Sequence, residues 1–358
     1  MRTLLRLAKF RQRLSELGAD GAIVTSRENV AYLTGFSGSA GTLVIAPGRA
    51  YLVTDGRYEI RAREVAKGYR VTLGKSLADV VNELPGRPRL AYEPTHLTDS
   101  RLSELQAGVR RAELRPESRV LEEIRAVKDP DEIALIERAA AIADEAWAAL
   151  QPSIVPGVTE VELSNQLEAA MKARGASGVG FDSIVASGPN SAIPHHETGD
   201  RRIREGDFIT FDFGALYKGY RSDMTRTVFI GEPTEKHREV YNAVYRAQVD
   251  SAAMIAPGVS GEDVANKARE IIKEAGYDKY FTHGLGHGVG RDVHELPGVG
   301  RGTIFEPGHV VTVEPGIYLE GWGGVRIEDT VFVTRSGSRP LTTSPKPAWP
   351  SPPGTVDG

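Results

Sequence analysis

A repeat in the second half of the chain constrains its fold more than any other feature. The segment Pro-Gly-Val-Thr at 156–159 recurs as Pro-Gly-Val-Ser at 257–260, which is 101 residues later. In each copy the Thr or Ser can cap a following helix with an acidic residue at its third position, and Gly175 or Gly276 can end that helix. The pattern predicts two helices in equivalent positions.

Two further segments recur in the same order. Gly-Asp-Phe-Ile-Thr-Phe-Asp at 206–212 recurs as Gly-His-Val-Val-Thr-Val-Glu at 308–314, and Arg-Ser-Asp at 221–223 recurs as Arg-Ile-Glu at 326–328. A single short match is common by chance, but three matches in one order at nearly one spacing indicate a duplication. We expect two similar α+β halves that pack about a pseudo-two-fold axis, with their strands meeting in one sheet.

The repeat aligns four carboxylates in pairs, Asp212 with Glu314 and Asp223 with Glu328. The runs beside them are too apolar to be surface strands, so these side chains should be buried together. Buried carboxylates repel one another and are costly unless a cation neutralises them. Lys218 is the only lysine in these segments, whereas two divalent metal ions would balance four negative charges. The pattern therefore predicts a dinuclear metal site.

The glycine-rich run 284–290 offers a further metal ligand, His287, because glycines leave its imidazole uncrowded. A buried histidine is more often a hydrogen-bonded core residue than a ligand. However, five of the eight histidines gather in two clusters within the half that carries the carboxylates, which favours metal binding and catalysis. These five are His195, His196, His283, His287 and His294. Oxygen ligands with one imidazole suit Mn²⁺ above all, with Co²⁺ or Zn²⁺ as alternatives.

Other classes of protein find little support. The chain has no cysteine, which excludes disulfides and thiolate nucleophiles, and its net charge of −4 is spread without a basic stripe for nucleic acid or a polybasic patch for membranes. The glycine-rich run lacks the Lys-Ser/Thr of a phosphate loop, and no His-Glu-x-x-His occurs. No apolar run could span a bilayer or serve as a secretory signal. We expect a cytoplasmic protein, with a transit peptide as the alternative for the basic N-terminus.

A chain of 358 residues exceeds what one hydrophobic core usually serves, so two domains are expected. Residues 1–118 alternate strand-like and helix-like runs and should form an α/β domain. We expect its strands at 21–25, 42–45, 51–54 and 89–92, the middle two as a hairpin, and helices at 57–67 and 77–83.

Residues 119–343 should form the second domain. It begins with a linker helix at 119–129, after which Asp129, Pro130 and Glu132 have the pattern of a helix start. The tail at 344–358 is rich in proline and should be extended or disordered.

The motifs that carry these residues resemble the Xaa-Pro peptidase family, which comprises prolidase and aminopeptidase P. The resemblance spans nearly the whole chain, because the first domain and its connector are similar to the family's creatinase-type N-terminal domain and linker. The matching motifs are Ile-Pro-His-His at 193–196, Asp-Phe-Gly-Ala at 212–215, Gly-Tyr-Arg-Ser-Asp-Met-Thr-Arg-Thr at 219–227, His-Gly-Leu-Gly-His-Gly-Val-Gly at 283–290, Asp-Val-His-Glu at 292–295, Val-Glu-Pro-Gly-Ile-Tyr at 313–318 and Val-Arg-Ile-Glu-Asp at 325–329.

The resemblance implies a pita-bread catalytic domain that hydrolyses the peptide bond before proline with two metal ions acting as Lewis acids. It implies that Asp223 and Glu328 bridge the metals. Asp212 would hold one of them further, and His287 and Glu314 the other.

The same resemblance implies roles for the other polar residues. His195 would hold substrate and assist the proline nitrogen, with His196 as the alternative one residue away. His294 would stabilise the oxyanion, and Glu314 is also a candidate proton shuttle. His283 and Arg326 would orient ligands from the edge of the site, with Arg326 serving Glu328, and either could instead contact substrate.

The resemblance leaves the exact substrate open. A dipeptidase must anchor a free carboxylate, for which Arg291 and Arg326 are the candidates, whereas an aminopeptidase needs an open channel there. We expect an Xaa-Pro dipeptidase, with an aminopeptidase as the alternative. We also expect a homodimer in which the loop 36–41 lines the partner's site. A metal-free binding module, a creatinase-like enzyme and a methionine aminopeptidase are further alternatives, of which the last lacks this type of first domain.

Overall fold

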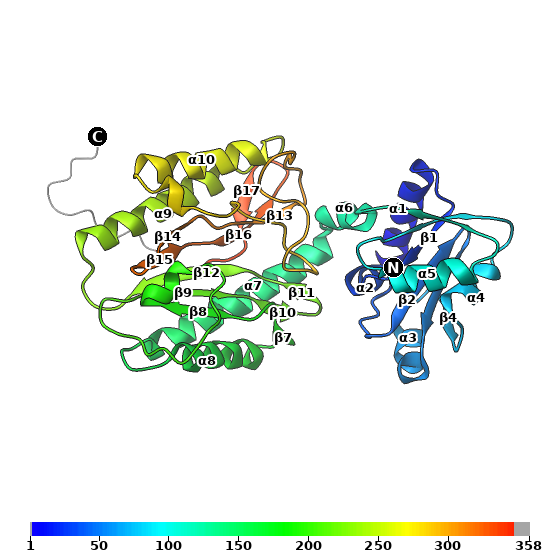
Figure 1. Cartoon of the computed structure of the whole chain (residues 1–358), viewed down its shortest axis with the longest axis horizontal. Helices are drawn as coiled ribbons and strands as arrows, with labels where there is room; N and C mark the ends of the chain where they lie inside the picture. The colour runs from blue at the N-terminus through cyan, green and yellow to red at the C-terminus, as the bar shows by residue number, and fades with distance from the viewer. Residues whose placement is uncertain (1, 347–358) are drawn as a thin grey trace. The chain divides into compact units, whose positions relative to one another are not determined.

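The computed structural model describes residues 2–346, and the chain divides into two compact units between Arg125 and Ala126 (Figure 1). The first unit contains one sheet of six strands in the order β4-β3-β2-β1-β5-β6. Its strands are β1 (Gly21–Val24), β2 (Gly41–Ala46), β3 (Arg49–Thr54), β4 (Arg70–Leu73), β5 (Arg89–Tyr92) and β6 (Glu113–Pro116). The helices are α1 (Arg2–Glu16), α2 (Arg27–Thr34), α3 (Glu59–Val65), α4 (Leu77–Asn82), α5 (Asp99–Gly108) and α6 (Val120–Ala126).

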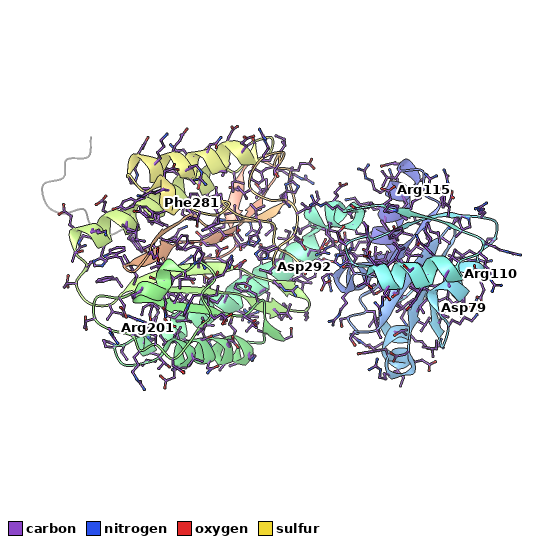
Figure 2. All side chains as sticks on the ribbon, in the orientation of Figure 1. Asp79, Arg110, Arg115, Arg201, Phe281 and Asp292 are labelled. Carbon is purple, nitrogen blue, oxygen red and sulfur yellow. The ribbon has the colours of Figure 1, made fainter. Side chains whose placement is uncertain are left out.

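Successive side chains along each strand face opposite sides of this sheet, so the unit has a hydrophobic core on each face. Ala22 and Val24 pack with α1, α2, α3 and α6 on one face, while Ile23 packs with α4 and α5 on the other. The predicted α/β class and the β2–β3 hairpin are therefore confirmed. The predicted helix at 77–83 is present as α4, with Ser76 and Asp79 forming a capping box at its start. Asp79 is labelled in Figure 2.

Helix α6 corresponds to the expected linker helix. Its Val120, Leu121 and Ile124 are buried in the core that also contains α1 and α2. The domain boundary after residue 118 stays a prediction. Phe36, in the loop that we expected to line a partner's site, is fully buried and packs edge-on against Tyr58, 5.6 Å between ring centres.

The second unit has the two-fold pattern that the repeat predicts. One half pairs α7 (Pro130–Leu150) with α8 (Glu160–Ala173), and the other pairs α9 (Glu235–Met254) with α10 (Gly261–Glu274). Figure 1 shows α8 on one side of the strands and α9 and α10 on the other. The strands are β7 (Gly178–Val179), β8 (Ile184–Ser187), β9 (Phe208–Phe213), β10 (Ala215–Tyr217), β11 (Tyr220–Arg221), β12 (Met224–Phe229), β13 (Val310–Val313), β14 (Gly316–Leu319), β15 (Gly323–Arg326), β16 (Asp329–Val333) and β17 (Ser338–Pro340).

The sheets of the two halves remain separate ladders, in contrast to the single sheet that we expected. The first half forms β12-β9-β8 and β11-β10-β7, and the second forms β13-β16-β17 and β14-β15. Individual hydrogen bonds join them instead: Glu328 N donates to Thr225 O over 3.1 Å, and Thr227 Oγ1 donates to Arg326 O over 2.8 Å. Residues 327–328, between β15 and β16, belong to no strand, and Glu328 there contacts the first half.

Two of the predicted helix starts have the capping contacts that the sequence indicated, and a third differs. Asp129 and Glu132 form a capping box at α7, and Thr159 and Glu162 form one at α8, as the sequence indicated. The second copy differs, because Ser260 accepts a hydrogen bond from Glu262 N and Asp263 takes no part in that cap.

The tail begins as ordered structure. Thr343 N and Ser344 N both donate to the Asp144 carboxylate over 2.8 Å, and Lys346 pairs with Asp329. The remainder of the proline-rich tail, from 347, lies outside the described residues. No helix in the part that the structure describes is long and apolar enough to cross a membrane.

A histidine in the second copy of the repeat yields a prediction about pH. His309 occupies the position of Asp207, and each accepts a hydrogen bond from the backbone three residues earlier, Asp207 from Arg204 N and His309 Nδ1 from Glu306 N. Burial, together with the charge of Lys128, lowers the pKa of His309 to about 4. The unfolded chain therefore takes up a proton near pH 6.5, before the folded protein does.

We expect this difference to destabilise the metal-free protein by on the order of 1–3 kcal/mol as pH falls from about 6.5 towards 4. A His309→Asn variant keeps an acceptor for Glu306 N but cannot titrate, so its free energy of unfolding should fall less steeply in that window. Urea unfolding of both proteins at a series of pH values measures this. The two slopes should coincide between pH 7 and 8, and equal slopes below pH 6.5 would contradict the prediction.

Candidate active site

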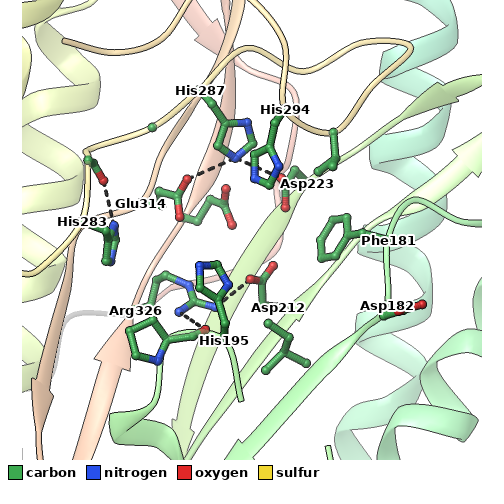
Figure 3. Close-up of a pocket in the computed structure, with 16 residues that line it drawn as sticks. Phe181, Asp182, His195, Asp212, Asp223, His283, His287, His294, Glu314 and Arg326 are labelled. Atoms are coloured by element: carbon green, nitrogen blue, oxygen red, sulfur yellow. Dashed lines mark hydrogen bonds and ion pairs between the residues drawn. The ribbon is translucent and has the colours of Figure 1, made fainter. Parts of the chain in front are cut away.

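The four aligned carboxylates lie where strands of the two halves begin or end. Asp212 is in β9, Asp223 directly precedes β12, Glu314 directly follows β13, and Glu328 directly precedes β16. All four, together with His287, line one pocket of about 400 Å³ (Figure 3). The structure thus brings together every residue that we expected to bind metal.

Three of these residues lie closest to one another. The ligand atoms of Asp223, His287 and Glu328 are all within 4.8 Å of each other. His287 Nε2 is 3.2 Å from Glu314 Oε1 and 3.6 Å from Asp223 Oδ2, while its Nδ1 is 3.1 Å from the carbonyl of Gly288. With a proton on Nδ1 donated to that carbonyl, the Nε2 lone pair points towards the carboxylates and can bind a metal.

The carboxylates of the pocket are buried close to one another, which favours the binding of a cation. Burial, reinforced by the neighbouring carboxylates, raises the pKa values of Asp223 and Glu328 well above their usual range. Burial also raises the pKa of Asp212, although Arg326 lies 2.6 Å away. At Glu314 the effect of burial is outweighed by the hydrogen bond and charge of His287, so its pKa is lowered.

Two carboxylate oxygens support the same conclusion. Asp212 Oδ1 and Asp223 Oδ1 are buried and have no hydrogen-bond partner among the described residues. A buried carboxylate oxygen without a donor is costly, and a divalent cation would satisfy it. These residues therefore fit the metal ions that the sequence predicts.

Arg326 is the one lysine or arginine among the described residues that line the pocket. We expected it to serve Glu328, but it contacts Asp212 directly and reaches Glu328 only through Thr225. Arg326 Nε donates to Thr225 Oγ1, which donates to Glu328 Oε2 over 2.7 Å. Its other guanidinium nitrogens donate to Asp212, to the Tyr318 hydroxyl and to the carbonyl of Pro194. The guanidinium is thus already occupied by protein partners.

Three histidines besides His287 line the pocket, whereas His196 does not. His195, His283 and His294 line the pocket, and the His294 ring lies edge-on to His287, 4.2 Å between ring centres. His283 Nε2 is 2.8 Å from the Tyr318 hydroxyl. Burial lowers the pKa values of His283 and His294. These three imidazoles can therefore contact a ligand bound in the pocket.

Two of the predicted substrate-binding residues lie outside this group. His196 Nε2 is 2.9 Å from Glu160 Oε2, and the Glu160 side chain is fully buried. Arg291 stacks on the Tyr220 ring, 5.0 Å from its centre. Neither is among the residues that line the pocket, so the structure gives them no contact with it.

Sequence reasoning missed several residues of the site. Thr225 bonds Glu328, Thr312 Oγ1 donates to Glu314 over 3.1 Å, and Tyr318 links Arg326 to His283. Their signal in the sequence is weak, since hydroxyls are common in strands. The same is true of the apolar wall of the pocket, which is formed by Phe181, Ile184, Pro194 and Val293.

Comparisons with known proteins agree with this geometry. Residues 134–335 match the model of metallopeptidase family M24, and residues 6–127 match that of the creatinase/prolidase N-terminal domain. An uncharacterized peptidase of Bacillus subtilis is 43% identical over 96% of this chain and 99% of its own length.

Two solved structures are also similar. An Xaa-Pro dipeptidase from Bacillus anthracis has a TM-score of 0.92 and 40% identity over 96% of this chain and 99% of its own. An X-Pro aminopeptidase from Thermotoga maritima has a TM-score of 0.88 and 36% identity over 95% of this chain and 98% of its own.

Proposed function

Because the chain belongs to metallopeptidase family M24 and carries a creatinase/prolidase N-terminal domain, we propose that it hydrolyses the bond before proline in Xaa-Pro dipeptides. The observation that supports this most strongly is the pocket itself. Five potential metal ligands face three histidines across a space walled by apolar side chains, which suits a proline ring.

We propose that Asp223 and Glu328 hold both metal ions, that Asp212 holds one further, and that His287 and Glu314 hold the other. Bound divalent metals would polarise the scissile carbonyl and make water more acidic. Manganese remains our prediction for the native metal, since oxygen ligands with one imidazole suit it.

The protein's own residues would complete the reaction. His195 is exposed at the pocket and can donate a proton to the departing proline nitrogen. His294 can donate to the oxygen on which negative charge develops. Glu314 lines the pocket beside His287 and can accept a proton from the attacking water. Arg326 holds Asp212 in place.

Two candidate activities differ in how they treat the carboxylate after proline: a dipeptidase must bind it, whereas an aminopeptidase must leave room for a longer chain. The higher identity and TM-score of the Bacillus anthracis dipeptidase favour a dipeptidase. However, Arg326 is engaged by protein partners and Arg291 lies outside the pocket lining, so the carboxylate would be received by histidines. This occupancy of the arginines favours the second candidate, an aminopeptidase that cleaves longer Xaa-Pro peptides.

Hydrolysis of Ala-Pro beside Ala-Pro-Ala, with Mn²⁺, Co²⁺ or Zn²⁺ added in turn, tests this choice. For a dipeptidase we expect a higher kcat/KM on Ala-Pro, and no cleavage of Pro-Ala, which lacks the required bond. Chelator should abolish turnover, and the metal should restore it. Equal or faster cleavage of Ala-Pro-Ala would establish the aminopeptidase instead, and no cleavage of either peptide would overturn the proposal.

Assembly and location remain proposals as well. We propose a homodimer, for which sedimentation of the purified protein is the test, and a location in the cytoplasm. Small peptides with proline in second position would be its ligands, without nucleic acid or membrane partners.

A further inference from the structure

A buried carboxylate at the start of α8 receives hydrogen bonds from the segment 187–199. It belongs to Glu160, the first residue of that helix, whose side chain is 0% exposed. Its Oε1 accepts from Ser187 N and Ser187 Oγ, each over 2.7 Å, and from Asn190 Nδ2 over 3.0 Å. The first turn of a helix also favours a negative charge. The beginning of the segment is therefore bound to α8.

The other oxygen of the same carboxylate receives the far end of the segment. Glu160 Oε2 lies 2.9 Å from His196 Nε2 and accepts a hydrogen bond from Gly199 N over 3.3 Å. The backbone adds one bond, in which Val161 N donates to Gly199 O over 3.0 Å. One side chain thus fastens both ends of the segment 187–199.

His195 lies within this segment and lines the pocket (Figure 3). Among the described residues, none forms a hydrogen bond with its imidazole. The direction of the ring therefore depends on the backbone on either side of it. Before it, Pro194 O accepts a hydrogen bond from Arg326 Nη1 over 3.2 Å. After it, the His196 side chain is bound to Glu160.

The contacts of Glu160 require an acceptor at each end of its side chain. Ser187 N and Gly199 N are backbone donors, and a backbone N–H cannot become an acceptor. A glutamine amide has one oxygen and one NH2 group, so it would turn a donor towards one of them. A glutamine of the same size would therefore release one end of the segment.

We propose that Glu160 is a positioning residue, which holds His195 at the pocket by fastening both ends of the segment 187–199. The inference rests on the proposed function, because it assumes that His195 donates a proton to the departing proline nitrogen. It differs from the structural contact of His196, since loss of that single donor leaves Ser187, Asn190 and Gly199 bound to the carboxylate.

A Glu160→Gln variant tests this first in the metal-free protein. We expect the NMR signals of the His195 imidazole to shift, while those of His309, which lies outside the pocket lining, stay in place. The His195 signals are identified as those absent from His195→Ala. With metal, kcat should fall by up to about 10²-fold, the effect of displacing a reacting group by roughly 1 Å. The content of bound metal should not change.

A double variant separates positioning from a general loss of stability. If Glu160 acts through His195, Glu160→Gln should cost little further kcat in a His195→Ala background. A substitution that only destabilises the fold would lower kcat by the same factor in both backgrounds. Steady-state kinetics of the wild type, the two single variants and the double variant measure this coupling.

The matched control is Glu162→Gln, the same substitution two residues further along α8. Glu162 accepts its hydrogen bonds from Thr159, in the capping box of the helix. This variant should lower thermal stability but leave both the His195 signals and kcat unchanged.

Unshifted His195 signals in Glu160→Gln, or an equal loss of kcat with and without His195, would overturn the inference. If Glu160→Gln does not fold, Asn190→Ala decides, because it removes one donor and keeps the carboxylate: shifted His195 signals support the inference and unshifted signals refute it. A wild-type protein that cleaves no Xaa-Pro substrate would refute the proposed function alone, because the NMR comparison without metal does not depend on activity.

Discussion

Asp223→Asn or Glu328→Gln should each reduce hydrolysis of an Xaa-Pro substrate by at least about 10³-fold, because a metal acting as a Lewis acid contributes several kcal/mol to catalysis. Each change removes one negative charge and keeps the size of the side chain. Both residues are buried, with pKa values raised by burial, so in the metal-free protein they repel one another when ionised. An amide at either position would leave two dications to share one bridging anion.

The same variants should bind less metal, while the metal-free protein should fold at least as well as the wild type, because a source of charge repulsion is gone. Metal content, thermal unfolding with and without metal, and kcat measure these effects. Asp263→Asn, an exposed change on α10, is the control and should alter none of them. Two bound metals and near-native turnover in either variant would contradict the bridging assignment.

The four carboxylates of the site could be found from the sequence because the repeat aligns them. Asp212, Asp223, Glu314 and Glu328 could be identified because duplication places equivalent residues in equivalent positions, and strand apolarity indicates burial. Helix starts such as Asp129 could be predicted because a cap depends on contacts within four residues. Local pattern and symmetry thus account for most of the fold and for the four carboxylates, whereas His287 was found from the clustering of histidines and glycines.

The rest depends on contacts that no local pattern encodes. Thr225 and Glu328 are 103 residues apart, and they meet only because the two halves join at the ends of their ladders. Arg326 was expected to serve Glu328, two residues away in sequence, but its guanidinium donates directly to Asp212. The expectation of one continuous sheet was wrong for the same reason, since the break in strand pairing at residues 327–328 cannot be read from apolar periodicity.

Which of His195 and His196 faces the pocket also depends on tertiary contacts. The two histidines lie at the end of a turn in which His196 N donates to Ile193 O over 3.2 Å, and their side chains have different surroundings. His195 lines the pocket, whereas His196 is held by the buried Glu160 carboxylate, which also accepts hydrogen bonds from Ser187 and Asn190. The surroundings therefore give His195 access to substrate and His196 a structural contact.

His195→Ala should therefore lose about 10²–10⁴ in kcat, the typical share of a general acid or base, with metal content unchanged. His196→Ala should keep most of the turnover but lower thermal stability, because buried Glu160 loses a hydrogen-bond donor. His196→Gln, which can still donate to Glu160, should recover part of that stability. Steady-state kinetics, metal analysis and thermal unfolding of the three variants separate these effects. A larger loss of kcat in His196→Ala than in His195→Ala would move the catalytic role by one residue, since only a group that reaches the reacting atoms can change turnover this strongly without changing the metal.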